Sequence, residues 1–272
     1  MKDFDKNLTI LVTSCDKYSD LWIPFIKLFR KFWSDCPYKL VLISESIICK
    51  EFDETILCDK GRKEGRKSSA ETICIALSQL TTPYVLLLCD DYFLIDYVNT
   101  NKIEKIIHDI KYYKSGCIKM LGDNTVLQSK ILQTQPANVA PEEYIEYPKG
   151  SPYRLSFQSS VWNRNFLLTL MKKADNIWDF ERKISYDKES YTMPIYGTRK
   201  RIFPYIEVVH KGKWEHLALQ ICNYNDISID LTKRGVLSSW DQLKRCIRTL
   251  ILETNPNMIV KFQNILSREK RK

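Results

Sequence analysis

The chain has 272 residues, of which 44% are hydrophobic, 12% aromatic and 28% charged, and only 8 are glycine. This composition excludes a disordered, collagen-like or low-complexity chain and predicts one large α/β domain or two small ones. The formal net charge of +9 is compatible with a nucleic acid, an anionic membrane surface or a phosphorylated substrate, and does not choose among them.

The nine cysteines are widely spaced, and no Cys-x-x-Cys pair occurs in the sequence. Several lie within apolar runs, as buried free thiols do, so a reducing compartment fits better than a disulfide framework. The N-terminal segment carries acidic residues before a short apolar run, which is a poor signal peptide, and no stretch reaches transmembrane length. These features predict an intracellular protein.

The N-terminal part predicts a βαβ unit. Residues 8–13 (LTILVT) and 39–44 (KLVLIS) are aliphatic and β-branched, which is typical of strands. Between them, apolar residues recur at helical spacing from Leu21 to Phe32, with Pro24 expected in the first helical turn. A strand, a helix and a second strand in this order predict a parallel pair with a right-handed crossover.

A polar segment at residues 50–67 follows and predicts a loop. Its basic run at 61–67 contains two glycines that would let the backbone approach a ligand, so it is either a solvated surface or an anion-contacting loop. The sequence Ser68-Ser-Ala-Glu71 is a capping box, and apolar residues then follow at helical spacing up to Leu80. A third βα unit is therefore expected before residue 95.

The most informative stretch is YVLLLCDDYF, residues 84–93, in which an apolar run ends in two adjacent carboxylates. A short continuous apolar run predicts a strand that is buried on both faces. Asp90 and Asp91 would repel one another there unless a divalent cation, a basic ligand or nearby Lys/Arg offsets the repulsion. Because ligands bind beyond the carboxyl ends of strands in open α/β sheets, we expect a metal and phosphate site. The alternative is a pair of residues that caps the next segment.

The remainder of the chain predicts shorter elements. In order, these are a helix at 103–113, a strand at 117–121, irregular structure at 122–150, a strand at 153–158, a helix with Phe166, Leu167, Leu170 and Met171 on one face, and one or two edge strands at 201–209. The last segment, residues 236–272, is expected to form a basic, amphipathic helical tail beside a main domain at 1–235. Such a tail is typical of docking to an anionic leaflet, although a solvated helix face or an oligomer contact explains it as well.

The order of these pieces resembles the nucleotide-sugar glycosyltransferases of the GT-A fold, of the type that builds bacterial surface polysaccharides. The resemblance rests on the polar loop TSCDKYS after the first strand, the double Asp, the later motifs S-x-Q-x-x-x-W and W-x-F-E, and a histidine near the C-terminal strands. It covers roughly residues 8–215, a single domain of ordinary size. It implies a Rossmann-like α/β fold with a mostly parallel central sheet flanked by helices. Cys89 stands where the family has the first Asp of its Asp-x-Asp motif.

The resemblance implies a metal and diphosphate site near the double Asp. Asp91 would coordinate Mn²⁺ or Mg²⁺ together with His210, and Asp90 would bind the ribose. Lys211 and Lys213, on either side of a glycine that follows His210, would face the diphosphate. A lone histidine is more often structural, and that reading of His210 stays open.

The resemblance also implies that the loop after the first strand holds the nucleoside base, commonly uracil. Thr13, Ser14, Asp16 and Tyr18 would line it, with Asp16 accepting a hydrogen bond from the base and Tyr18 stacking on the ring. The same residues would serve as a turn and a helix cap, and both roles are compatible.

An inverting transfer needs a general base to deprotonate the acceptor hydroxyl. By the resemblance, Glu181 would be this base, with Asp179 as the second candidate. Gln158, Trp162 and Trp178 would line the acceptor cleft. The alternative is that these aromatic residues belong to the core and the carboxylates to the surface.

The sequence thus predicts a glycosyltransferase that moves a sugar from a nucleotide-diphosphate donor, expected to be a UDP-sugar, to a glycan acceptor, expected to be lipid-linked. Two alternatives remain, a catalytically inactive paralogue that binds nucleotide sugars or glycans, which Cys89 favours, and a nucleotidyltransferase, whose Gly-rich basic loop is missing. Nucleic acid is not expected as a partner, because basic and acidic residues are mixed before the tail. We expect a cytoplasmic protein whose tail contacts the inner face of the membrane.

Overall fold

The computed structural model describes residues 4–58, 68–120, 122, 143–151, 153–187 and 193–242. In chain order the elements are β1 (Leu8–Thr13), a 3-10 turn (Asp16–Tyr18), α1 (Ser19–Phe32), β2 (Lys39–Ser44), β3 (Glu54–Leu57), α2 (Ser69–Gln79), β4 (Tyr84–Cys89), β5 (Tyr92–Leu94), α3 (Thr100–Tyr112), β6 (Cys117–Lys119), β7 (Tyr144–Glu146), β8 (Ser160–Asn163), α5 (Arg164–Met171), α6 (Ile177–Asp179), a π-helical turn (Phe180–Ile184), β9 (Ile195–Thr198), β10 (Tyr205–Glu207), β11 (Val209–His210), β12 (Lys213–Trp214) and α7 (His216–Tyr224).

The centre of the molecule is an eight-stranded sheet in the order β3-β2-β1-β4-β8-β6-β9-β7. Strands β3, β2, β1 and β4 run parallel, and β6 runs parallel to β9, whereas β8 and β7 are antiparallel to their neighbours. The predicted α/β fold with a mixed, mostly parallel central sheet is therefore confirmed. Two short antiparallel pairs, β5 with β10 and β11 with β12, lie outside this sheet.

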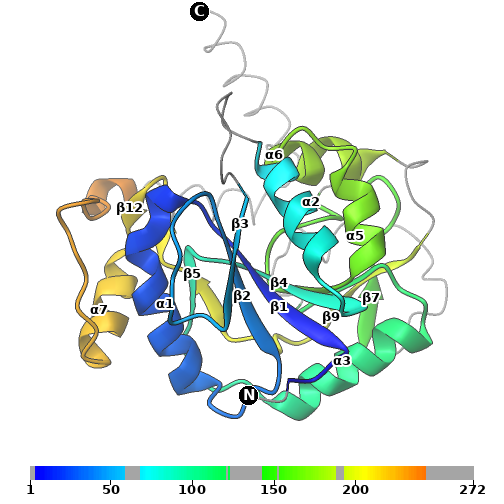
Figure 1. Ribbon diagram of the computed structural model, residues 1–272, viewed down its shortest axis with the longest axis horizontal. Helices are drawn as coiled ribbons and strands as arrows, with labels where there is room; N and C mark the ends of the chain where they lie inside the picture. Colours follow the sequence, from blue (N-terminus) through cyan, green and yellow to red (C-terminus); the bar gives the residue numbers. More distant parts are fainter. Residues whose placement is uncertain are drawn as a thin grey trace, which may run out of the picture.

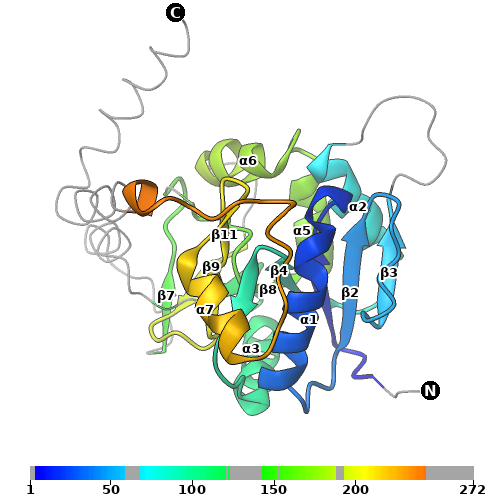
Figure 2. The ribbon, with the colours of Figure 1, turned by 90° about the vertical axis from the view of Figure 1, so that its left-hand side faces the viewer.

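Helices cover both faces of the sheet (Figures 1 and 2). Successive residues of β1 point to opposite faces, so Ile10 packs in the core cluster that includes residues of α1, α3 and α7, whereas Leu11 packs in the cluster that includes residues of α2 and α5. Both side chains are fully buried, as are Leu86 and Leu87 in the neighbouring β4. The two central strands are thus apolar on both faces, which explains their continuous hydrophobic runs.

The connections create a crevice at the centre of the sheet. From β1 the chain crosses to β2 and β3 on one side, and it returns to β4 on the other side of β1. The register pairs Thr13 with Cys89, so β1 and β4 end side by side. In open α/β sheets, such a reversal of strand order at the carboxyl ends is where ligands bind.

Most of the predicted elements are present in the described residues. The strands at 8–13 and 39–44 are confirmed, and the capping box is formed, with Ser68 accepting from the Glu71 N–H and Glu71 accepting from the Ser68 N–H. Pro24 lies in the second turn of α1 and not in the first, because the helix begins at Ser19, two residues before the first apolar position, Leu21.

Two predictions about strands were wrong. Residues 153–158 form turns, because Tyr153 adopts a left-handed conformation with φ 52°, and the strand of this region is β8, which fits between β4 and β6. The segment expected to be entirely loop contains β3, in which Ile56 is buried and pairs with Ile43 of β2. A short edge strand needs only one buried residue. A single apolar residue in a polar segment does not form the alternating pattern by which a strand is predicted from sequence.

Several predictions fall outside the described residues. These are the basic run at 61–67, most of the segment at 122–150 and the tail beyond residue 242. The tail is described only as far as residue 242, and residues 239–242 are helical. In the part of the chain that the structure covers, no helix combines the length and hydrophobicity that crossing a membrane requires.

Candidate active site

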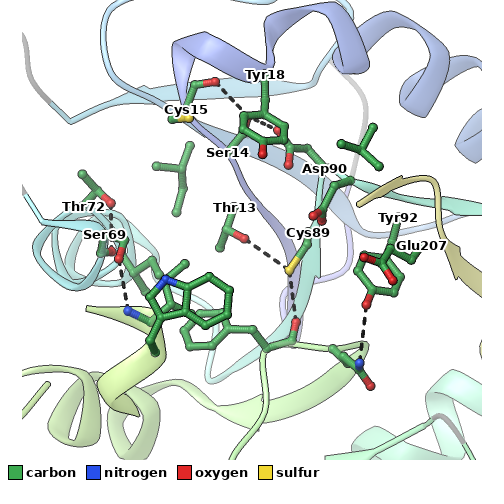
Figure 3. A pocket seen from close by; sticks show the side chains of 18 of the residues that line it. Thr13, Ser14, Cys15, Tyr18, Ser69, Thr72, Cys89, Asp90, Tyr92 and Glu207 are labelled. Atoms are coloured by element: carbon green, nitrogen blue, oxygen red, sulfur yellow. Dashed lines mark hydrogen bonds between the residues drawn. The ribbon is translucent and has the colours of Figure 1, made fainter. Parts of the chain in front are cut away.

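A cavity of about 750 Å³ opens at the carboxyl ends of β1 and β4 (Figure 3). Its size is within the range of small-molecule sites, which is roughly 300–1,000 Å³. The walls come from the loop after β1, the turn between β4 and β5, the first turns of α2, the segments around Phe157 and Trp178, and strands β10 and β11 with the residue that follows. Ten predicted site residues line it: Thr13, Ser14, Tyr18, Asp90, Asp91, Gln158, Trp178, Glu181, His210 and Lys211.

Asp90 forms the floor of the cavity and is only 6% exposed. The Ser14 hydroxyl donates to its carboxylate, and the Trp22 indole N–H donates to the Ser14 oxygen at 2.7 Å. Burial and the adjacent Asp91 raise the pKa of Asp90 well above its ordinary value. The carboxyl group of Asp90 is therefore buried and fixed by its hydrogen bond with Ser14. Figure 3 shows it beside Ser14 and Tyr18.

Asp91 faces a second carboxylate that the sequence analysis missed, Glu207 of β10. Burial and the charge of Glu207 raise the pKa of Asp91 to about 6. The pairing of β5 with β10 places Glu207 opposite Tyr92, and the Val208 N–H donates to the Asp91 carbonyl at 2.8 Å. Nothing in the local sequence marks Glu207, because its place depends on a pairing between strands more than 100 residues apart.

His210 completes this wall of the cavity. Its Nδ1 lies 2.8 Å from Glu207 Oε1, and its charge, when protonated, lowers the pKa of Asp91. Lys211 and Gly212 both have positive φ and form the two-residue turn of the β11–β12 hairpin, a geometry that a glycine favours. The turn places Lys211 against the cavity, whereas Lys213 is exposed and does not line it.

The residues of this wall suit a hard divalent cation in their chemistry. Asp91 and Glu207 supply carboxylate oxygens, the donors that Mg²⁺ and Mn²⁺ prefer, and their mutual repulsion is what a cation would relieve. Within the described residues, no group of three or more His, Cys, Asp or Glu is arranged to hold a metal ion by itself. Mg²⁺ is commonly held by one or two protein carboxylates together with substrate and water, and Asp91 with Glu207 offers that donor set.

Glu181 lines the cavity from the π-helical turn Phe180–Ile184. Burial raises its pKa, and the Phe157 N–H, which donates to Oε1 at 2.9 Å, opposes that rise and orients the carboxylate. Trp178 is 66% exposed at the rim, and the Gln158 side chain approaches the Tyr92 hydroxyl at 3.5 Å. A carboxylate with a raised pKa beside an exposed aromatic face is suited to accept a proton from a hydroxyl-bearing ligand.

Trp162 and Asp179 do not reach the cavity. Trp162 is fully buried in β8, where its ring contacts Phe166 and Phe180 and its N–H donates to Ser160 at 2.7 Å. It therefore belongs to the core. Asp179 accepts from Lys183 at 2.9 Å, one helical turn away, and does not line the cavity, so the geometry favours Glu181 over Asp179.

Asp16 also points away from the cavity. Backbone N–H groups of Glu45 and Ser46 donate to its carboxylate at 3.0 and 3.1 Å. Burial acts to raise the pKa of Asp16, but the hydrogen bonds from Ser46 and its neighbours lower it to below the ordinary value. Asp16 thus connects the loop after β1 with the loop after β2. In the loop after β1, Tyr18 has an aromatic ring that lines the cavity and can contact a ligand.

Cys89 occupies a buried position beside Asp90 and Asp91, where the charge of a further carboxylate would be energetically unfavourable. Its thiol lies 3.3 Å from the Phe157 carbonyl, and burial with the charges of Asp91 and Asp90 raises its pKa well above the ordinary value. The Tyr205 hydroxyl bonds both the N–H and the carbonyl of Cys89, at 2.6 and 2.8 Å. A third carboxylate here would be buried beside two others, which a neutral thiol avoids.

Comparison with known proteins gives structural similarities alone. No family model matches the chain, and no curated protein does. Residues 1–349 of S. aureus TarS in complex with UDP-GlcNAc match at 14% identity over 76% of this chain and 60% of that chain, with a TM-score of 0.47. GalNAc-T7 with UDP, GalNAc and Mn²⁺ matches at 9% identity over 73% of this chain and 43% of that chain, with a TM-score of 0.49. The chain thus shares an α/β fold with these two proteins over about three quarters of its own length and spans less than two thirds of theirs.

Proposed function

We propose that this chain is a glycosyltransferase that transfers a sugar from a nucleotide-diphosphate donor to a glycan acceptor. The observation that carries the proposal is the convergence of Asp91, His210 and Glu181 on one cavity at the point where the strand order reverses. These residues come from three distant parts of the chain. Their proposed roles belong to one reaction: Asp91 as a cation ligand, His210 as a metal or diphosphate contact, and Glu181 as a base.

The charge of the cavity supports a cation-dependent donor site. Its described lining includes the carboxylates of Glu45, Asp90, Asp91, Glu181 and Glu207, with Lys211 and His210 as basic groups. A nucleoside diphosphate would be repelled by such a surface without a cation between them. Asp91 and Glu207 are the residues that would hold Mn²⁺ or Mg²⁺, with diphosphate oxygens as further ligands. The cation would neutralise the leaving diphosphate as a Lewis acid.

Other residues of the cavity would bind the donor and the acceptor. The Tyr18 ring would stack on the nucleoside base, for which uracil is the expected identity, and Lys211 would contact the diphosphate. Trp178 and Gln158, which also line the cavity, would orient the acceptor sugar. Glu181 would take the proton of the acceptor hydroxyl as it attacks the anomeric carbon from the face opposite the leaving group, which makes the transfer inverting.

Membrane docking through the tail at 236–272, beside the domain at 1–235, is part of the same proposal. The excess of Lys and Arg in the tail suits an anionic leaflet at the cytoplasmic side, where a lipid-linked acceptor for surface polysaccharide synthesis would be presented. Sedimentation with anionic liposomes at low salt tests this, and a chain that stays in the supernatant under those conditions would exclude it.

The donor site is tested by calorimetry with a panel of nucleoside diphosphates, with and without Mn²⁺. We expect Mn²⁺-dependent binding of UDP that Asp91→Ala abolishes, whereas Asp96→Ala, which removes an exposed carboxylate beyond β5, leaves it unchanged. No binding of any nucleotide would defeat the proposal. Nucleotide binding without transfer to any acceptor would instead indicate an inactive binding protein.

A further inference from the structure

A buried arginine outside the cavity supports the ring that lines it. Arg234 is 8% exposed, and its guanidinium donates to both carboxylate oxygens of Asp20 at 2.7 Å. A third hydrogen bond goes to the Lys17 carbonyl at 3.3 Å. The guanidinium is therefore fixed to the loop and helix start that follow β1, by a bidentate geometry that lysine does not reproduce.

The same guanidinium lies over the Tyr18 ring, with its central carbon 4.5 Å from the ring centroid. Tyr18 lines the cavity, whereas Arg234 does not, so the guanidinium contacts the ring from outside the cavity. A cation at this distance from an aromatic face is attracted to it and restricts the orientation of the ring. Figure 3 shows that ring at the cavity next to Ser14 and Asp90.

The segment that carries Arg234 is itself anchored to the hairpin that carries His210. The Trp214 N–H donates to the Gly235 carbonyl at 3.0 Å, and the Leu237 N–H donates to the Trp214 carbonyl at 2.8 Å. Trp214 belongs to β12, the hairpin partner of the strand that contains His210. One short segment thus connects the wall of Tyr18 with the wall of His210.

We propose that Arg234 is a positioning residue that holds the Tyr18 ring in place to receive the nucleoside base of the donor. The inference rests on the proposed function and goes beyond it, because it assigns a role to a residue that touches neither donor nor cation. It divides the donor site into a nucleoside half that depends on the contact of Arg234 with Tyr18 and a diphosphate half that Arg234 reaches only through its charge, which acts on Asp90 and Asp91 and which lysine retains.

The test compares two ligands on one variant. Arg234→Lys keeps the positive charge but loses the flat guanidinium and its bidentate bonds. We expect the dissociation constant of UDP with Mn²⁺, measured by calorimetry, to rise about tenfold, while that of pyrophosphate with Mn²⁺ stays within about twofold. Arg30→Lys is the matched control, because it changes another α1-associated Arg–Asp pair, Arg30–Asp53 at 2.9 Å, whose residues do not line the cavity.

A second variant controls for the case in which Arg234→Lys does not fold. Removing one partner of a buried ion pair is strongly destabilising, whereas replacing both with apolar residues is often tolerated, so Asp20→Leu with Arg234→Met is the companion. We expect it to lower UDP affinity as Arg234→Lys does. Because it also removes the charge that acts on Asp90 and Asp91, UDP and pyrophosphate are compared on Arg234→Lys. Unchanged UDP affinity in both variants, or an equal loss for UDP and pyrophosphate in Arg234→Lys, would overturn the positioning role. A wild-type chain that binds no nucleotide would instead refute the proposed function.

Discussion

Asp91→Asn is expected to stabilise the ligand-free protein at neutral pH, although Asp91 is the central residue of the proposed cation site. In the folded chain, burial and the nearby Glu207 raise the pKa of Asp91 from 3.8 to about 6. A group whose pKa is raised by folding opposes folding once it is ionised. Asn keeps the shape of the side chain and carries no charge, so it removes this opposition.

The sign and size follow from the two pKa values. The carboxyl contributes no penalty below pH 3.8, where it is protonated in both states; the penalty grows as the pH rises to about 6 and is constant above that. A shift of this size corresponds to about 2–3 kcal/mol at pH 7. For a chain of this length, the melting temperature of the variant should be higher by about 4–5 °C.

The assay is thermal unfolding of wild type and Asp91→Asn between pH 4 and pH 8, without and with Mn²⁺. The stability difference should grow through the interval from pH 4 to pH 6, and Asp96→Asn, at an exposed position, should leave the melting temperature unchanged. Mn²⁺ should stabilise wild type more than the variant, because it offsets the repulsion that the variant has already lost. A variant that is no more stable than wild type at pH 7 would refute the reasoning.

Further changes test the other assignments. Glu181→Gln should lower the rate of transfer by roughly 10²–10⁴, measured as turnover with saturating donor, and leave calorimetric donor binding intact. Trp162→Ala should reduce the free energy of unfolding by about 3–5 kcal/mol in urea titrations, while the folded fraction keeps its donor affinity, because the ring fills the core and not the cavity. Ser68→Ala should cost about 1 kcal/mol in the same titration by removing the cap of α2, and a neutral result would contradict the capping assignment.

The central part of the fold could be predicted from the sequence because its signals are local. The runs at 8–13 and 84–89 are long and apolar enough to predict strands that are buried on both faces, and a polar loop or a double Asp directly follows each. Once two such strands are taken as parallel neighbours, their carboxyl ends must meet. The position of Asp90 and Asp91 in a cleft was therefore predictable without knowledge of the rest of the sheet.

The other walls of the cavity could not be predicted in the same way. Glu207 reaches Asp91 only because β10 pairs with β5, and Arg234 reaches Tyr18 only because its segment pairs with Trp214. Such contacts between distant residues leave no periodic pattern in the sequence. For Asp16 the error is the opposite one, because a residue was predicted to bind a ligand and instead bonds to the protein. Its carboxylate accepts hydrogen bonds from backbone N–H groups of a neighbouring loop.

The contrast between the whole chain and its cavity limits which ligands are plausible. The chain carries a net charge of +9, yet the described lining of the cavity holds more carboxylates than basic groups. A protein that bound an anion by charge alone would place its basic residues at the site. Because the carboxylates at this site are buried and their pKa values are raised, ionising them has an energetic cost that a ligand must offset. A divalent cation would offset the cost of ionising the carboxylates, and a diphosphate would supply the remaining ligands of the cation. Because each component would favour binding of the other, we expect the two to bind cooperatively.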